Sequence, residues 1–287
     1  MTNARNQGVL PPGQPPIVHL VGAGPGAPDL LTLRAARLLA RADIVFHDAL
    51  VPEGVLALCA RAIRIRVGKR SGRYSTAQAF INKQLVDAAH KYKVVVRLKG
   101  GDPMLFGRAH EEISHLKEKN IRCEIVSGVT SALAATAELG VSLTARGLAR
   151  SVAFLTTRAA KGERPNGWLK VALAADTVVI YMGAGEAEAI AGALIGAGKS
   201  PATPVAIVER ASLPGARNLS GTLVELPALA ARCGDGPVAI LMGEVYRDAA
   251  ASQIIEPWPS KQPSGGQSSF SATAPATRNG RARSSSS

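Results

Sequence analysis

Cysteine is scarce in this sequence, with 3 among 287 residues. Cys59, Cys123 and Cys233 are odd in number, far apart and outside any CxxC spacing, which indicates neither a disulfide framework nor a zinc site. Aromatic residues make up 4% of the chain, too few for the stacking platform of a single-strand RNA binder. These shortages favour an ordinary globular protein of a reducing, cytoplasmic compartment.

Long apolar runs and metal or nucleophile motifs are also lacking. No stretch approaches the ~18 uncharged apolar residues of a membrane span, and no apolar signal region follows the N-terminus, so we expect no membrane association. HExxH, Walker A and GxSxG are absent. His110 and His115 are five residues apart and do not share a helix face, so we predict no metal site.

Acidic residues are outnumbered, with 21 Asp and Glu against 34 Lys and Arg, and the net charge is +13. Residues 17–250 keep 29 of the basic and 20 of the acidic side chains, a net charge of +9. Such a body attracts polyanions, which include nucleic acid, an anionic membrane surface and a small polycarboxylate.

Short β-branched runs alternate with Ala/Leu-rich stretches, a pattern that predicts an α/β fold with mostly parallel strands. Glycine and basic residues interrupt the pattern near 140–150. We therefore expect a flexible leader over 1–16, α/β domains over 17–140 and 141–250, and a disordered Ser/Pro/Arg-rich tail over 251–287. The expected strands are Ile17–Val21, Ile44–Phe46, Ile63–Val67, Val94–Leu98, Ile121–Val126, Val152–Thr156, Thr177–Tyr181, Val205–Val208, Leu219–Val224 and Val238–Leu241.

The first glycine motif is VGAGPGAPD, directly after the first expected strand. Gly22, Gly24 and Ala27 fit a GxGxx(G/A) dinucleotide fingerprint, in which glycines let the backbone approach a phosphate. Pro25 and Pro28 weaken that interpretation because proline has no backbone N–H to donate. A tight turn without a ligand is the alternative.

The second glycine motif is RLKGGDPMLFGR, which closes another expected strand with Gly100, Gly101 and Asp102. Paired glycines at a strand end again suit a close approach to a ligand. Asp102 is a candidate acceptor for a ribose or amine, and an Asp-Pro turn is the alternative.

Two further chargeable residues close expected strands, Asp48 in IVFHDALV and Lys69 in VGKR. A carboxylate at the end of a strand can accept a proton, and a partly desolvated lysine can donate one. Exposed ion pairing explains either residue equally well at this stage.

Taken together, several motifs closely resemble uroporphyrinogen-III C-methyltransferases of the tetrapyrrole methylase family. They are VGAGPGAPDLLTLRAARLLARADIVFHDALV, VGKR, VVVRLKGGDPMLFGR, SGVTSALA, VIYMG and PVAIVE, and the resemblance runs from about Ile17 to Arg247. The HDALV, VGKR and RLKGGDP segments resemble the uroporphyrinogen enzymes in particular. Because only a short leader precedes Ile17 in this sequence, we expect no preceding dehydrogenase–chelatase module of the kind found in the fused siroheme synthases.

The resemblance implies two α/β domains of the tetrapyrrole methylase type with the active site in the cleft between them, usually in a homodimer. It implies two successive S-adenosylmethionine-dependent methylations of uroporphyrinogen III to precorrin-2 through precorrin-1, for sirohaem or cobalamin biosynthesis, with S-adenosylhomocysteine as coproduct and no metal. Asp48 then matches the proton acceptor and Lys69 the proton donor. The implied cofactor contacts are Pro25, Gly100, Gly101, Asp102, Leu105, Thr130, Ser131, Met182 and Ala211.

The sequence departs from the family pattern at Ser127, Ala145, Ala109-His110 and Thr157-Arg158, none of them among the implied cofactor contacts. We therefore expect the cofactor to be retained and the substrate cleft to differ. A methylase of a later precorrin is a second interpretation. A basic RNA-binding protein and a nicotinamide-dependent oxidoreductase are interpretations from other classes. The favoured one involves no nucleic acid, and the small polycarboxylate becomes the expected polyanion.

Overall fold

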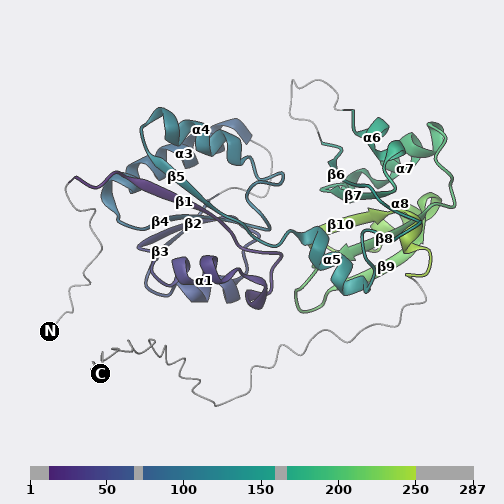
Figure 1. The fold of residues 1–287 in the computed structure, drawn as a ribbon, viewed down its shortest axis with the longest axis horizontal. Coiled ribbons are helices and arrows are strands. Elements are labelled where there is room, and N and C mark those ends of the chain that lie inside the picture. Colours follow the sequence, from purple (N-terminus) through teal and green to yellow (C-terminus); the bar gives the residue numbers. More distant parts are fainter. Residues whose placement is uncertain (1–12, 68–73, 159–166, 250–287) are drawn as a thin grey trace, which may run out of the picture. The chain divides into compact units, whose positions relative to one another are not determined.

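The structure of the chain is a computed structural model, which describes residues 13–67, 74–158 and 167–249. Ten strands form two five-stranded sheets within these ranges, and helices pack on both sheets (Figure 1). All ten expected strands are present, so the predicted α/β class is confirmed. The predicted tail lies outside the described residues, as does the leader up to residue 12.

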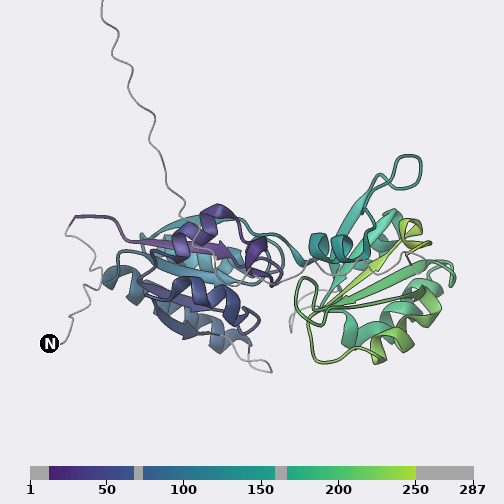
Figure 2. The same cartoon turned by 90° about the horizontal axis from the view of Figure 1, so that it is seen from below.

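The first sheet has the strand order β3-β2-β4-β1-β5, and all of its pairings are parallel. Helices α1 and α2 bury one face of this sheet and helices α3 and α4 bury the other (Figure 1, and from below in Figure 2). The bounds are β1 Ile17–Gly22, α1 Leu33–Leu39, β2 Ile44–His47, α2 Glu53–Leu56, β3 Ile63–Arg66, α3 Tyr74–Lys91, β4 Val95–Lys99, α4 Ala109–Glu118 and β5 Arg122–Val126.

The central strands β1 and β4 determine where a ligand can approach this sheet. The chain leaves β1 toward the helices on one face and leaves β4 toward α4 on the other face. In an open α/β sheet, ligands usually bind at the carboxyl ends of two neighbouring strands whose connections lead to opposite faces of the sheet. Both glycine motifs lie at these two strand ends.

The second sheet has the order β6-β7-β10-β8-β9. Only the β6–β7 pairing is parallel, while β10 runs antiparallel to β7 and β8, and β9 runs antiparallel to β8. The expectation of mostly parallel strands is therefore wrong for this sheet. Its elements are β6 Val152–Thr156, α6 Trp168–Ala174, β7 Thr177–Tyr181, α7 Ala187–Gly196, β8 Pro204–Glu209, β9 Arg217–Thr222, α8 Leu226–Ala231 and β10 Val238–Met242.

The reason is the short connection between β8 and β9, which holds no helix. A parallel crossover needs about a dozen or more residues, usually including a helix, whereas a short loop joins antiparallel neighbours. The remaining short helical turns are η1 Pro28–Leu30, η2 Ala57–Cys59, η3 Ala184–Glu186, η4 Leu223–Glu225 and η5 Glu244–Tyr246.

Helix α5 (Ser131–Leu139) follows the last strand of the first sheet but packs on the second sheet. Its buried residues Ala132, Ala135 and Leu139 share a core cluster with Ala206 of β8 and Leu241 of β10, while α6, α7 and α8 cover the other face. The domain boundary at 140/141 stays a prediction. The packing of α5 favours a boundary before Ser131.

Candidate active site

The two glycine motifs form one structure at the carboxyl ends of β1 and β4. The Gly24 N–H donates to the Gly101 carbonyl at 3.2 Å, and the Gly101 N–H donates to the Gly24 carbonyl at 2.8 Å. Their φ angles of 70° and 65° lie in the left-handed region that glycine adopts without strain. Pro25 follows Gly24 directly and Gly100 precedes Gly101, so two of the predicted cofactor segments are hydrogen-bonded to each other.

A third loop, from the end of β5, joins this pair through Gly128. A Cβ atom at Gly128 would lie 2.3 Å from the Gly101 carbonyl oxygen, and one at Gly22 would lie 2.6 Å from the Gly128 Cα atom. The contacted atoms are backbone and have little room to move. The three loops therefore meet at a distance that only glycine permits. The sequence interpretation missed Gly128, although SGVT directly after an expected strand was a usable signal.

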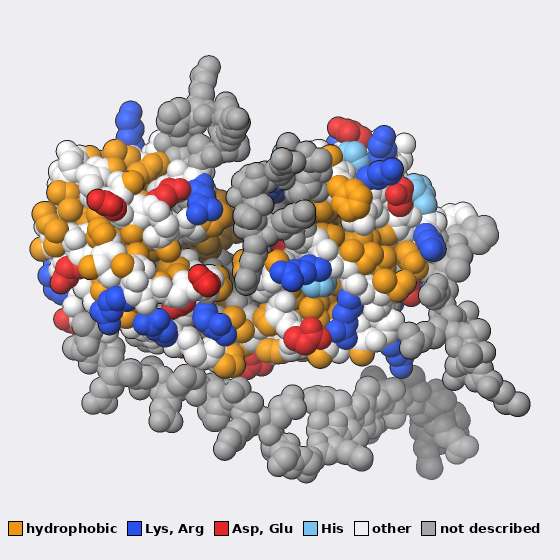
Figure 3. Space-filling view, turned by 180° about the vertical axis from the view of Figure 1, so that it is seen from behind, with side chains coloured by type: hydrophobic (Ala, Val, Ile, Leu, Met, Phe, Trp, Pro, Cys, Tyr) orange, Lys and Arg blue, Asp and Glu red, His pale blue; other side chains and the backbone are white. Residues whose placement is uncertain are grey.

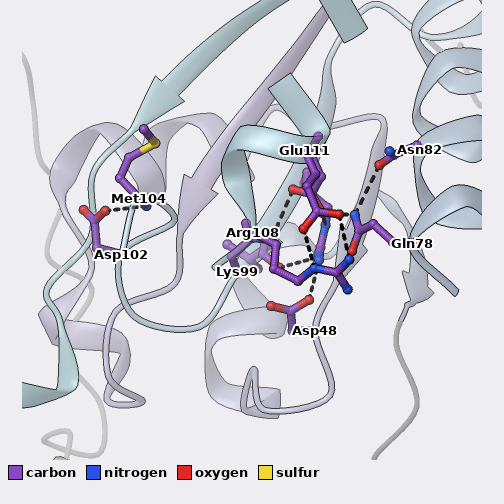
Figure 4. A network of polar contacts seen from close by, with 11 residues as sticks. Asp48, Gln78, Asn82, Lys99, Asp102, Met104, Arg108 and Glu111 are labelled. Carbon is purple, nitrogen blue, oxygen red and sulfur yellow. Dashed lines mark hydrogen bonds and ion pairs between the residues drawn. The ribbon is translucent and has the colours of Figure 1, made fainter. Parts of the chain in front are cut away.

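Asp102 holds two of these loops in place. Its Oδ1 accepts a hydrogen bond from the Met104 N–H at 2.8 Å, which closes a turn, and its Oδ2 accepts one from the Gly128 N–H at 2.9 Å (Figure 4 labels Asp102 and Met104). The turn expected from Asp-Pro is thus present, and the carboxylate also ties β4 to β5. Each oxygen keeps a lone pair that can accept a further hydrogen bond. The predicted hydrogen bond from a ribose or amine to Asp102 stays a prediction.

Two hydrogen bonds link these loops to segments of the second sheet. The Thr130 side-chain oxygen lies 2.6 Å from the Tyr181 hydroxyl, and the Ala27 N–H donates to Ser212 Oγ at 3.1 Å. The ring of Tyr181 also packs on Phe106, with 5.2 Å between ring centroids. Burial raises the pKa of Tyr181, so its hydroxyl stays protonated at neutral pH. Tyr181 is a second site residue that the sequence interpretation missed.

Residues with strained backbone are concentrated in the segments that carry the predicted cofactor contacts. Of the six described non-glycine residues with positive φ, five lie in the segments that carry predicted cofactor contacts. Left-handed φ at such residues costs about 1–3 kcal/mol each and clusters at functional sites. One of them, Met182, is itself a predicted contact with a φ of 59° and a side chain 45% exposed. The other four are Phe106, Arg108, Arg210 and Ser212.

The structure thus places the predicted cofactor residues in a few segments joined by the contacts above. Their roles as cofactor contacts stay predictions. Asp48 directly follows β2, and Lys69 lies outside the described residues. The cofactor residues are Pro25 after β1, Gly100, Gly101, Asp102 and Leu105 after β4, Thr130 and Ser131 at the start of α5, Met182 after β7, and Ala211 after β8.

Asp48 belongs to a buried network of charges, drawn in Figure 4. Arg97 of β4 donates from Nη2 to Asp48 Oδ1 at 2.5 Å and from Nε to Glu112 Oε1 at 3.0 Å. Lys99 donates from Nζ to Glu112 Oε2 at 3.1 Å, and Gln78 donates to Glu112 Oε1 at 3.1 Å. The sequence interpretation did not identify Arg97, Lys99 or Glu112 as site residues.

The pKa values of the two cations in this network shift in opposite directions. Burial and the neighbouring guanidinium of Arg97 lower the pKa of Lys99. Burial alone would also lower the pKa of Arg97, but the carboxylates of Asp48 and Glu112 raise it above its ordinary value. The network thus holds a permanently charged arginine beside the predicted proton acceptor.

The three cysteines have raised thiol pKa values, chiefly through burial. For Cys123, on β5, burial and the charge of Glu112 raise the pKa from 9.0 to about 11. We expect iodoacetamide at pH 8 to alkylate native Cys123 about 100-fold more slowly than the same thiol in the unfolded chain, because the thiolate is the nucleophile. Mass spectrometry of peptides after timed alkylation, with and without urea, measures this ratio.

Equal alkylation rates in the native and unfolded chains would contradict the raised pKa of Cys123. The same shift has a sign for stability. The unfolded thiol ionises first. The contribution of Cys123 to the free energy of unfolding is therefore fully present below about pH 9 and is lost as the pH rises through about 11. Thiol catalysis at neutral pH is thereby disfavoured.

Two kinds of feature are absent from the described part of the chain. It contains no group of three or more His, Cys, Asp or Glu side chains arranged to hold a metal ion. None of its helices combines the length and the apolar character needed to span a bilayer.

Comparison with protein families gives a match to the family described as Tetrapyrrole (Corrin/Porphyrin) Methylases over residues 18–227. A siroheme synthase of Psychrobacter sp. (strain PRwf-1) is 44% identical over 232 residues, which are 80% of this chain and 48% of that protein. This chain therefore spans about half the length of the curated relatives that it matches.

Solved structures match over most of their length. A uroporphyrin III C-methyl transferase from Thermus thermophilus is 40% identical with a TM-score of 0.70, and the match covers 80% of this chain and 93% of that one. The Thermus thermophilus enzyme complexed with S-adenyl homocysteine has a TM-score of 0.69 at 40% identity, covering 80% and 98%.

Proposed function

Because this chain belongs to the tetrapyrrole methylase family, we propose that it is a uroporphyrinogen-III C-methyltransferase that uses S-adenosylmethionine. The observation that carries the proposal is the 40% identity with the Thermus thermophilus enzyme over 93% of that chain. Two successive C-methylations give precorrin-2 through precorrin-1. The siroheme synthases among the relatives support a place in sirohaem biosynthesis, and cobalamin biosynthesis is the second destination proposed.

The residues at the three-loop junction fit the proposed cofactor. A Cβ atom at Gly101 would meet the Thr130 Cα atom and one at Gly100 would meet the Leu50 Cβ atom, each at an ordinary contact distance of 3.9 Å, so neither position is crowded by the protein. The exposed Met182 side chain provides an apolar contact. When bound, S-adenosylmethionine supplies a methyl group already activated by its positive sulfur.

The chain itself then has two tasks, to orient the reactants and to move a proton. An electron-rich pyrrole carbon attacks the methyl group in line, so orientation supplies much of the acceleration. The methylated ring must then lose a proton, and Asp48 at the end of β2 is the proposed acceptor. Lys69 is the proposed donor in the same reaction.

The positive charge of the body suits a substrate with many carboxylates, since each charge-assisted contact contributes about 1.5–3 kcal/mol. On the face shown in Figure 3, Lys and Arg side chains are scattered among hydrophobic and acidic ones. Binding along a nucleic acid instead calls for basic residues clustered on one face. This face thus lacks the clustered basic surface that the RNA-binding interpretation requires.

The proposal extends to the state of the protein in the cell. We propose a homodimer located in the cytoplasm, with two α/β domains and the substrate bound between them. The family of the chain and its two α/β sheets support this organisation.

Anaerobic incubation of the purified protein with uroporphyrinogen III and S-adenosylmethionine tests the function. The mass of the tetrapyrrole should rise by one methyl group and then by a second, because precorrin-1 is the substrate of the second transfer. A reaction without S-adenosylmethionine is the control. An unchanged mass would refute the proposal, and consumption of a later precorrin would instead support the second interpretation. Calorimetry with S-adenosylhomocysteine and NAD distinguishes the oxidoreductase, since only one of the two should bind.

A further inference from the structure

We propose that Arg97, anchored by Glu112, is a positioning residue that fixes the orientation of the Asp48 carboxylate. The inference rests on the proposed function, in which Asp48 accepts a proton. It adds to that function two residues, Arg97 and Glu112, to which the sequence interpretation gave no role.

The guanidinium of Arg97 is held on three sides. Nη2 donates to Asp48 Oδ1 at 2.5 Å, Nε donates to Glu112 Oε1 at 3.0 Å, and Nη1 donates to the Leu98 carbonyl at 3.1 Å. The side chain is 3% exposed, so water does not compete for these donors. A planar group with each nitrogen engaged has one orientation, and it imposes that orientation on its carboxylate partner.

Glu112 is the fixed point of the network. It is fully buried in α4 and accepts hydrogen bonds from Arg97, Lys99 and Gln78. Arg97, Lys99, Glu112 and Asp48 carry two positive and two negative charges, so the network is balanced. A buried carboxylate with three donors cannot readily turn away, so Glu112 anchors Arg97 through Nε while Nη2 binds Asp48.

Asp48 is the only exposed end of this arrangement. Its side chain is 34% exposed, against 4% or less for Arg97, Lys99 and Glu112. Its Oδ1 is engaged by Arg97, and no described residue donates a hydrogen bond to its Oδ2. One oxygen is thus fixed while the other is available to accept the proton released by the methylated ring.

A double-mutant cycle separates positioning from a structural role, because residues that act as a unit are not additive. Arg97→Lys keeps the charge but cannot donate to Asp48 and Glu112 with one planar fork. It should lower kcat about tenfold to 100-fold in the wild-type background, since a misplacement of about 1 Å costs as much. In an Asp48→Asn background it should change kcat less than about twofold. Single-turnover transfer of labelled methyl groups measures the slow variants.

Three comparisons complete the experiment. Glu112→Gln should show the same background dependence with a smaller loss of kcat, and it decides the question if Arg97→Lys does not fold. The control is Arg64→Lys, which makes the same change in the exposed ion pair between Arg64 of β3 and Glu53 of α2 and should leave kcat unchanged. Affinity for S-adenosylhomocysteine, measured by calorimetry, should be the same in every variant.

The outcomes are distinct. Equal losses of kcat in the wild-type and Asp48→Asn backgrounds would overturn the positioning role and leave the proposed function standing. A wild-type protein that transfers no methyl group to uroporphyrinogen III would overturn the proposed function and this inference together.

Discussion

Asp48→Asn should lower kcat for methylation of uroporphyrinogen III by about 100-fold to 10,000-fold, the usual contribution of a positioned general base. Asparagine has nearly the same shape and can still accept the hydrogen bond from Arg97, so the local structure should persist. What it loses is the ability to take up a proton. Affinity for S-adenosylhomocysteine should stay unchanged, because Asp48 is not among the predicted cofactor contacts.

Steady-state kinetics with calorimetry on the same preparation provide the measurement. Asp87→Asn is the matched control, since Asp87 is exposed on α3 and the same chemical change there should leave kcat at the wild-type value. If Asp48→Asn is as fast as the wild type, Asp48 is not the proton acceptor. A loss of cofactor affinity equal to the loss of rate would instead make Asp48 part of the cofactor site.

Gly128→Ala should weaken binding of S-adenosylhomocysteine at least about tenfold, which corresponds to about 1.4 kcal/mol. The added Cβ atom would lie 2.3 Å from the Gly101 carbonyl oxygen and 2.9 Å from the Gly22 Cα atom. The loops after β1, β4 and β5 must therefore separate. Overpacking of this kind also lowers the free energy of unfolding by about 1–3 kcal/mol.

Calorimetry and urea denaturation measure the two effects of Gly128→Ala. Gly192→Ala is the matched control, because a Cβ atom there has no neighbour within 4 Å and Gly192 lies inside helix α7. That substitution should raise the free energy of unfolding by about 0.5–1 kcal/mol, the gain of alanine over glycine in a helix. Wild-type affinity in Gly128→Ala would show that the three-loop junction is not the cofactor site.

Local pattern predicted the strands well, but not how they pair. Each of the ten β-branched runs forms a strand because residue type and hydrophobic periodicity are local properties of the sequence. The antiparallel pairings of the second sheet depend on connection length, and the loop between β8 and β9 is too short for a crossover. The end of the run at Leu219–Val224 was also misjudged, because Leu223–Glu225 forms a 3-10 turn.

The site was predictable where glycine marked it and not where tertiary contact defines it. Gly100, Gly101 and Asp102 stand out at a strand end, whereas Glu112 looks like an ordinary exposed residue of an amphipathic helix. Its burial follows from α4 packing over Arg97 and Lys99 of β4, a contact between segments 13 and 15 residues apart. Tyr181 gains its partner Thr130 across 51 residues, which no local pattern reports.

The position of α5 bears on the thermodynamics of binding. Thr130 and Ser131, at the start of this helix, are predicted to contact the cofactor, while its buried face belongs to the core of the second sheet. Folding has already removed the conformational freedom of this backbone, so binding loses little further entropy there. Because the start of α5 is preorganised, we expect a small entropic penalty for binding the cofactor and a site that is rigid before the substrate binds.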